Sequence, residues 1–178
     1  MCSNLSYPKT GYNLPKENVL VLSCIDLRLT DDLQDFLNYD NLTNRYDLFT
    51  LAGTALMTQR LNPEMEGNFK PVPADEHDKL CIWKDIWDVH LNISLDLHKI
   101  RDVYIMEHEN CGAYKAYLTE NYRIKDEQQQ HEEFSRALMD NIQKANPYLN
   151  VHSFYIDLRG NIKLLETRHK LEEYKASL

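Results

Sequence analysis

The sequence predicts an α/β fold, with a mainly parallel central β-sheet flanked by helices. Two observations support this prediction. Apolar runs of strand length alternate with segments in which apolar residues recur at helical spacing, as in chains that build parallel sheets. In addition, the first run, "NVLVLSC" at 18–24, is continuously apolar and rich in valine and leucine, which is typical of a strand covered on both faces. With 178 residues and 43% hydrophobic composition, we expect one domain over 1–178.

The first half of the chain contains two predicted strands. Residues 1–17 are polar with two prolines, so we expect an N-terminal arm that packs on another surface or frays. The strand at 18–24 is followed by a helix that Asp31 and Asp32 open, since acidic residues favour a first turn. The segment "YDLFTLAGTAL" predicts a second short strand and a tight turn at Gly53.

The segment 59–85 is polar and carries three prolines, so we interpret it as a long insertion loop, a lid or an interface element. A helix is expected over 82–99. The run "DVYIMEH" at 102–108 predicts a strand, and "NCGAYKAYL" turns into another helix. The amphipathic stretch "EEFSRALMDNIQKA" predicts a helix that ends before Pro147. Finally, "VHSFYID" predicts the last strand, with "RGN" as its turn and "IKLLE" as a return strand.

Composition argues against several classes of partner. The formal net charge is −8 and the basic residues are scattered, so we expect no binding to nucleic acid. No apolar run approaches the roughly 20 residues that span a bilayer, and the start lacks a signal-peptide core, so we expect no membrane association and a cytoplasmic location. Four widely spaced cysteines do not suggest a disulfide framework, which leaves thiol chemistry or metal binding.

Candidate metal ligands stand at the ends of two predicted strands. Cys24 ends the first strand, His108 ends another, and Cys111 follows in the turn. The carboxyl ends of parallel strands gather at one edge of a sheet, so these residues can meet there. A Cys-His-Cys set leaves the fourth tetrahedral position open, as in catalytic zinc sites. Each residue taken alone is more often a packed core residue than a ligand.

Asp26 and Arg28 add to this prediction. Asp26 follows Cys24 by two residues, so an extended strand end places it on the same side and within reach of the open position. The guanidinium of Arg28 can hold that carboxylate away from the metal through a bidentate pair. Without a metal nearby, the two residues would be an ordinary ion pair.

The two motifs C-x-D-x-R and H-x-x-C-G stand complete in the chain, as Cys24 to Arg28 and His108 to Gly112. In these motifs the sequence resembles the β-class carbonic anhydrases, and its first motif is most similar to their compact prokaryotic branch. The resemblance implies that Cys24, His108 and Cys111 bind Zn²⁺ and that Asp26 and Arg28 form a catalytic dyad. It also implies attack of zinc-bound hydroxide on carbon dioxide to give bicarbonate, and a homodimer or higher homo-oligomer.

Three features depart from that family. Leu27 replaces a small residue, the segment 50–54 with Leu51 keeps only the Ala-Gly of the family's pattern, and the loop 59–85 is longer. Two alternatives therefore stay open. One is a related zinc hydrolase of carbonyl sulfide or carbon disulfide; the other is a catalytically silent zinc-binding homologue with a role in assembly or sensing. Glu107 or Glu109 could orient His108, although solvated charge is the plainer interpretation for both.

Overall fold

The computed structural model describes residues 5–71, 73–120 and 126–170, with residues 74–81 described by their backbone. It contains a five-stranded sheet in the order β2-β1-β3-β4-β5. The strands are β1 (Val19–Ser23), β2 (Tyr46–Thr50), β3 (Asp102–His108), β4 (Asn150–Ile156) and β5 (Ile162–Arg168). The first four run parallel and β5 returns antiparallel to β4. This confirms the predicted α/β class with a mainly parallel sheet.

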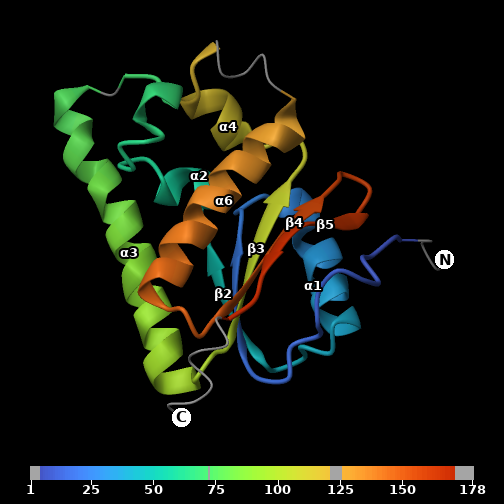
Figure 1. Cartoon of the computed structure of the whole chain (residues 1–178). Helices are drawn as coiled ribbons and strands as arrows, with labels where there is room; N and C mark the ends of the chain where they lie inside the picture. Colours follow the sequence, from blue (N-terminus) through green and yellow to red (C-terminus); the bar gives the residue numbers. More distant parts are fainter. Residues whose placement is uncertain (1–4, 72, 121–125, 171–178) are drawn as a thin grey trace.

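Helices cover both faces of the sheet (Figure 1). They are η1 (Leu27–Leu29), α1 (Thr30–Tyr39), α2 (Ala55–Thr58), η2 (Glu66–Asn68), α3 (Ala74–His98), α4 (Gly112–Tyr117) and α6 (Glu127–Ala145). One core cluster lies between the sheet and α2, α3 and α6, and a second lies between the sheet and α1. Among the described helices, none is both long enough and apolar enough to cross a membrane.

The prediction of a long loop over 59–85 is wrong in its second half. Helix α3 begins at Ala74, directly after Pro73, so residues 74–85 are helical, and the rest of the segment includes η2. The polar run "DEHDK" concealed the helix because its residues lack apolar periodicity. A proline just before the first turn and acidic residues within it are nevertheless ordinary features of a helix start. Helix α6 likewise begins at Glu127, earlier than predicted, because Asp126 caps it by accepting a hydrogen bond from the Gln129 N–H at 3.3 Å.

The N-terminal arm packs on its own chain over residues 5–17; residues 1–4 lie outside the described residues. The Tyr7 ring lies 5.5 Å from the ring of Phe36 in α1. The Tyr12 hydroxyl donates to the Asp40 carboxylate at 2.8 Å, and the Tyr104 hydroxyl of β3 donates to the same carboxylate. The arm therefore closes the α1 side of the sheet.

Candidate metal centre

Three possible metal ligands meet at the carboxyl edge of the sheet. Cys24 follows β1, His108 is the last residue of the neighbouring strand β3, and Cys111 lies just before α4. Their Sγ and ring nitrogen atoms all lie within 4.8 Å of one another. One Zn²⁺ at about 2.3 Å from each sulfur and about 2.0 Å from the nitrogen can join donors so spaced after small side-chain shifts.

The His108 imidazole has one nitrogen engaged and one free to bind a metal. Its Nδ1 lies 3.0 Å from the Glu109 carbonyl oxygen, which can only accept a hydrogen bond, so Nδ1 carries the proton. The Nε2 atom is buried and has no hydrogen-bond partner among the described residues. A buried nitrogen without a partner is costly, whereas a metal ion would satisfy it. The residues present therefore fit a bound metal.

The two thiols differ in their readiness to ionise. A hydrogen bond from the Cys111 thiol lowers the pKa of the Cys24 thiol to about 4, against the burial that opposes ionisation. The same contact raises the pKa of Cys111 well above its ordinary value, because a second thiolate beside the first is unfavourable. Thiolate is the form that binds metals, so the lowered pKa of Cys24 favours binding of a cation. A bound divalent ion would also offset the repulsion between two thiolates, which keeps Cys111 protonated.

Gly53 supports Cys24 from the turn after β2. Its backbone N–H donates to Cys24 Sγ at 3.4 Å. Gly53 has φ +75°, a conformation that L side chains rarely adopt, and a Cβ atom there would lie 2.8 Å from the Ala113 Cβ of α4. The turn and the helix that follows Cys111 thus meet at a position where only glycine fits without movement.

Asp26 and Arg28 form a paired acid and base beside this cluster. Arg28 Nε donates to Asp26 Oδ1 at 2.8 Å and an Arg28 terminal nitrogen donates to Oδ2 at 2.5 Å. A terminal nitrogen of Arg28 also reaches the Asn110 carbonyl oxygen at 3.2 Å, which links the two motifs. Asp26 Oδ2 lies 3.9 Å from His108 Nδ1. The hydrogen bonds from Arg28 hold the pKa of Asp26 well below its usual value, so the carboxylate is ionised at neutral pH.

Two of the departures from the family's pattern do not fill the site. Leu27 is 86% exposed, so its side chain projects into solvent and does not add bulk beside the dyad. Leu51 is partly buried and packs against the core cluster under α2, α3 and α6. Its backbone N–H donates to the Ser23 carbonyl oxygen at 2.8 Å, which extends the pairing of β2 with β1.

Glu107 is completely buried, so the plainer interpretation of this residue as a solvated charge is wrong. Its carboxylate accepts hydrogen bonds from the Ala55 N–H at 3.0 Å, the Tyr114 hydroxyl at 3.2 Å and the Ser135 hydroxyl at 3.4 Å. His131 Nδ1 of α6, also fully buried, lies 2.6 Å from the same carboxylate. One carboxylate therefore ties α2, α4 and α6 to the strand end that carries His108.

The sequence does hold a signal for this network. Glu107 alternates with Val103 and Ile105, which face the core cluster of α2, α3 and α6, so the strand period places it on that buried face. His131 occupies the apolar side of α6, three and seven residues before Phe134 and Leu138. What the sequence does not reveal is that these two polar positions face each other.

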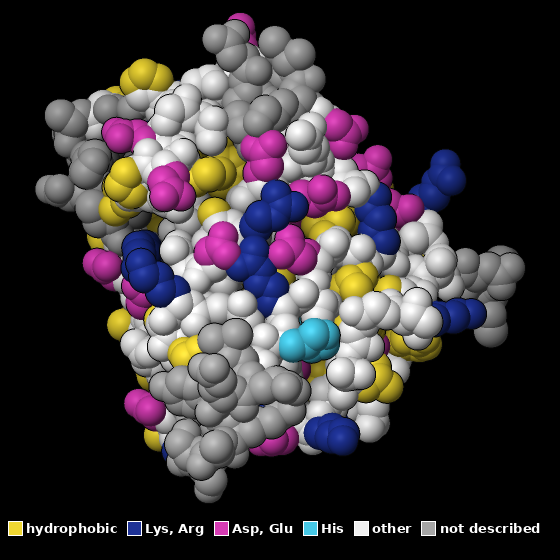
Figure 2. Space-filling view, viewed as in Figure 1, with side chains coloured by type: hydrophobic (Ala, Val, Ile, Leu, Met, Phe, Trp, Pro, Cys, Tyr) yellow, Lys and Arg dark blue, Asp and Glu magenta, His cyan; other side chains and the backbone are white. Residues whose placement is uncertain are grey.

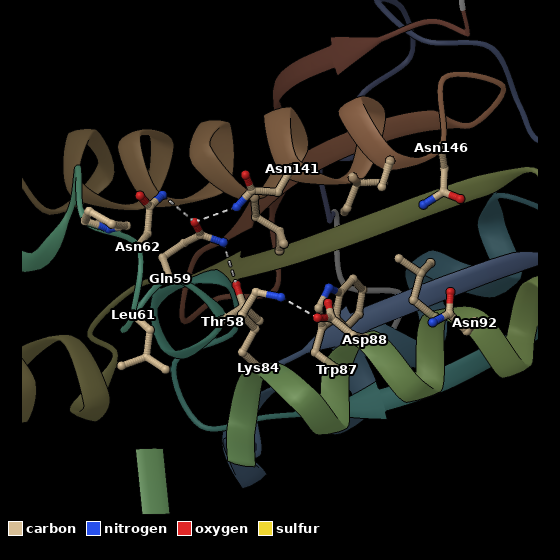
Figure 3. Close-up of a pocket in the computed structure, with 15 residues that line it drawn as sticks. Thr58, Gln59, Leu61, Asn62, Lys84, Trp87, Asp88, Asn92, Asn141 and Asn146 are labelled. Carbon is tan, nitrogen blue, oxygen red and sulfur yellow. Dashed lines mark hydrogen bonds and ion pairs between the residues drawn. The ribbon is translucent and has the colours of Figure 1, made fainter. Parts of the chain in front are cut away.

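A separate cavity of about 490 Å³ lies between α2, α3 and α6 (Figure 3). The polar side chains at one end of the cavity point toward one another: Asn62 and Asn141 both donate to the Gln59 side-chain oxygen, at 2.9 and 3.0 Å. The Gln59 nitrogen donates to the Thr58 hydroxyl at 3.0 Å. These amides satisfy one another, and none of the proposed metal ligands lines the cavity. It is therefore distinct from the metal centre.

Comparison with known proteins gives distant similarities. No sequence-family model matches the chain. An uncharacterized protein of Rickettsia bellii is 26% identical over 158 residues, which cover 88% of this chain and 86% of that protein. An uncharacterized protein of Rickettsia conorii is also 26% identical, and the match covers 84% of this chain and 73% of that protein. Among solved structures, a carbonic anhydrase from Glaciozyma antarctica is similar with a TM-score of 0.47 at 17% identity, covering 85% of each chain. Tetrameric β-carbonic anhydrases from Sordaria macrospora are similar with a TM-score of 0.49 at 15% identity, covering 85% of this chain and 82% of theirs.

Proposed function

We propose that the protein is a zinc-dependent carbonic anhydrase, which interconverts carbon dioxide and bicarbonate. The observation that carries the proposal is the bidentate Asp26–Arg28 pair beside the cluster of Cys24, His108 and Cys111. A Cys-His-Cys cluster alone would also suit a structural zinc site. A charged pair whose carboxylate lies 3.9 Å from the His108 ring of such a cluster could handle water and protons there.

Cys24, His108 and Cys111 would hold Zn²⁺. When bound, Zn²⁺ supplies Lewis acidity and a nucleophile derived from water at near-neutral pH. The thiolates of Cys24 and Cys111 would balance the charge of the ion, and the His108 Nδ1–H bond to the Glu109 carbonyl oxygen holds the ring so that Nε2 stays available as a ligand.

Asp26 and Arg28 would act on the attacking water. Arg28 engages both carboxylate oxygens of Asp26, which would keep that side chain from serving as a fourth ligand. Because the pKa of Asp26 is depressed, its carboxylate is a hydrogen-bond acceptor and not an acid at neutral pH. It can orient a water molecule through one of its protons, which aligns a lone pair toward carbon dioxide.

The two alternatives have less support from the site. The Leu51 region and the long segment 59–85 are the reasons to consider hydrolysis of a sulfur analogue. The Leu51 side chain packs against the core cluster, and the second half of the segment is the start of α3. A catalytically silent homologue would need Asp26 on the metal, whereas Asp26 is paired with Arg28 here. A homo-oligomer, which the resemblance to the β-class carbonic anhydrases implies, is part of the proposal.

The test is stopped-flow hydration of carbon dioxide by purified, zinc-loaded protein at several pH values up to about 9. We expect acceleration that chelation abolishes and zinc restores. Asp26→Asn should retain zinc and lose most of the activity, whereas Glu64→Gln, an exposed acid outside the cluster, should match the wild type. Zinc-loaded protein that fails to accelerate the reaction at any pH would rule out the proposed function. Sulfide release from carbonyl sulfide in that case would favour the sulfur alternative.

A further inference from the structure

The cavity between α2, α3 and α6 has the size of a small-molecule binding site. Its volume is about 490 Å³, and pockets that hold small ligands usually measure about 300–1,000 Å³. Such pockets combine a mostly apolar wall with a few polar groups that fix the orientation of the ligand. The lining of this cavity follows that pattern.

Apolar side chains from two helices line the cavity. They are Trp87 and Leu91 of α3 and Leu138 and Ile142 of α6. All four side chains belong to the core, and each is at most 6% exposed. A flat ring with apolar faces can therefore lie between the two helices. The indole of Trp87 is only 2% exposed, so it offers almost no ring face on which a sugar could stack.

Carboxamide side chains gather at both ends of the cavity (Figure 3). Gln59, Asn62 and Asn141 lie at one end. Asn92 and Asn146 lie at the other end. A carboxamide places N–H donors beside a carbonyl acceptor. These groups favour a ligand that also carries donors and acceptors side by side.

The three carboxamides at the first end hold one another in position. Asn62 and Asn141 both donate to the Gln59 side-chain oxygen, at 2.9 and 3.0 Å. A carboxamide has two N–H groups and two lone pairs on its oxygen, so Asn62 and Asn141 each keep a second N–H. No hydrogen bond between described residues uses the Asn141 oxygen. Groups that are held in place but still able to bond lose little freedom when a ligand binds.

The helices around this end are also fixed from the other side. Gln59 donates to the hydroxyl of Thr58, the last residue of α2, and α2 begins at Ala55, whose N–H donates to the Glu107 carboxylate. Helix α6 is tied to the same carboxylate through His131. The carboxamides thus stand on or directly beside anchored helices, which position binding groups better than loops do.

The cavity offers no unpaired charge. Among the described residues that line it, only Lys84 and Asp88 are charged, and their side chains form an ion pair with each other. On the face of the molecule that carries α6, basic side chains are interspersed with acidic ones and form no extended patch (Figure 2). A phosphate or carboxylate group would therefore find no free cation. The lining favours an uncharged ligand.

We propose that this cavity binds an uncharged nucleoside, with its base between the apolar side chains of α3 and α6. A nucleobase has flat faces and carries donors and acceptors side by side along its edge, and Asn and Gln recognise such edges through paired hydrogen bonds. The carboxamides of Gln59, Asn62 and Asn141 would contact the edge of the base. Those of Asn92 and Asn146 would contact the ribose hydroxyls. The site is separate from the proposed metal centre and does not depend on its activity.

The first test is titration of the full, zinc-loaded chain with adenosine, guanosine, cytidine and uridine, followed by NMR. The Trp87 indole N–H and the Asn141 side-chain N–H signals should shift with at least one nucleoside, with a Kd below about 1 mM. The 5′-monophosphate of that nucleoside should bind more weakly, because its charge finds no free partner. No shift with any of the four at about 5 mM, or a monophosphate or free ribose that binds as tightly as the nucleoside, would overturn the proposal.

The second test uses variants at exposed positions of α6, each checked for an unchanged circular dichroism spectrum. Asn141→Leu removes hydrogen-bonding groups and should weaken binding about tenfold. Ala145→Phe, at an exposed residue that lines the cavity, should fill the space and abolish binding. The matched control is Gln143→Leu, which lies outside the cavity and donates only to the His169 carbonyl oxygen, and it should bind as the wild type. Binding that neither Asn141→Leu nor Ala145→Phe weakens would place the nucleoside elsewhere and contradict the proposal. None of these outcomes depends on whether the protein hydrates carbon dioxide.

Discussion

Removal of the Glu107 carboxylate should destabilise the fold more than any other single change at the candidate metal centre. In Glu107→Ala, the buried His131 loses the carboxylate that lies 2.6 Å away, and the Ala55 N–H loses its acceptor. Leaving a buried donor without its acceptor costs about 1–3 kcal/mol, so the loss at these two buried groups should cost about 2–6 kcal/mol in total. That is a large part of the total stability of about 5–15 kcal/mol that is typical of a domain.

Two further variants separate charge from shape. Glu107→Gln keeps one oxygen that can accept from the Ala55 N–H but replaces the other oxygen with an NH₂ group, so we expect a smaller loss, of about 1–3 kcal/mol. Glu109→Ala is the matched control, because Glu109 is only partly buried and its carboxylate accepts one backbone hydrogen bond, from the Leu158 N–H at 3.0 Å. Its cost should stay near 1 kcal/mol.

The assay is urea denaturation followed by circular dichroism at pH 7, on metal-free and zinc-loaded protein, with the free energy of unfolding extrapolated to water. The predicted order of stability is wild type, Glu109→Ala, Glu107→Gln and Glu107→Ala. If Glu107→Ala and Glu109→Ala unfold within about 1 kcal/mol of each other, the buried carboxylate does not tie these elements together, and the reasoning is refuted.

Three other predictions test the surroundings of the site. Metal-free protein treated with iodoacetamide at about pH 6 should be alkylated at Cys24 and not at Cys111, because the pKa of Cys24 is about 4; a Cys24 rate that rises with pH up to about 8, as for an ordinary thiol, would contradict this. Gly53→Ala should lower stability by about 1–3 kcal/mol and weaken zinc binding in chelator competition, whereas unchanged values would show that the turn adapts without strain. Burial raises the pKa of Asp40, so its stabilising effect is present below its unfolded pKa and is lost as pH rises. Asp40→Asn should therefore cost more at about pH 4 than at about pH 7, and a pH-independent difference in urea denaturation would argue against the raised pKa.

The inner strands β1, β3 and β4 were predictable because each one is a short, mostly apolar run, and the structure buries each of them along nearly its whole length. The start of α3 was not predictable from the sequence, because its first turns are polar and the prolines before Ala74 indicated a loop. Cys24, His108 and Cys111 could be placed together from the sequence because each lies at or directly after a strand end, and parallel neighbouring strands align their ends at one edge of the sheet.

The support of the site was harder to foresee because it depends on contacts between distant elements. Short motifs report the residues that would touch the metal, whereas Glu107 joins β3 to α6 through His131, 24 residues further along the chain. The periodicity of each segment is compatible with a buried face at both positions, but periodicity does not state which helix covers which strand end. A carboxylate and an imidazole on buried faces of separate elements must find partners, because an unpaired buried charge is too costly to retain. Two polar residues at otherwise apolar positions are therefore a reason to expect that their elements meet, and here that meeting holds the strand end that carries His108.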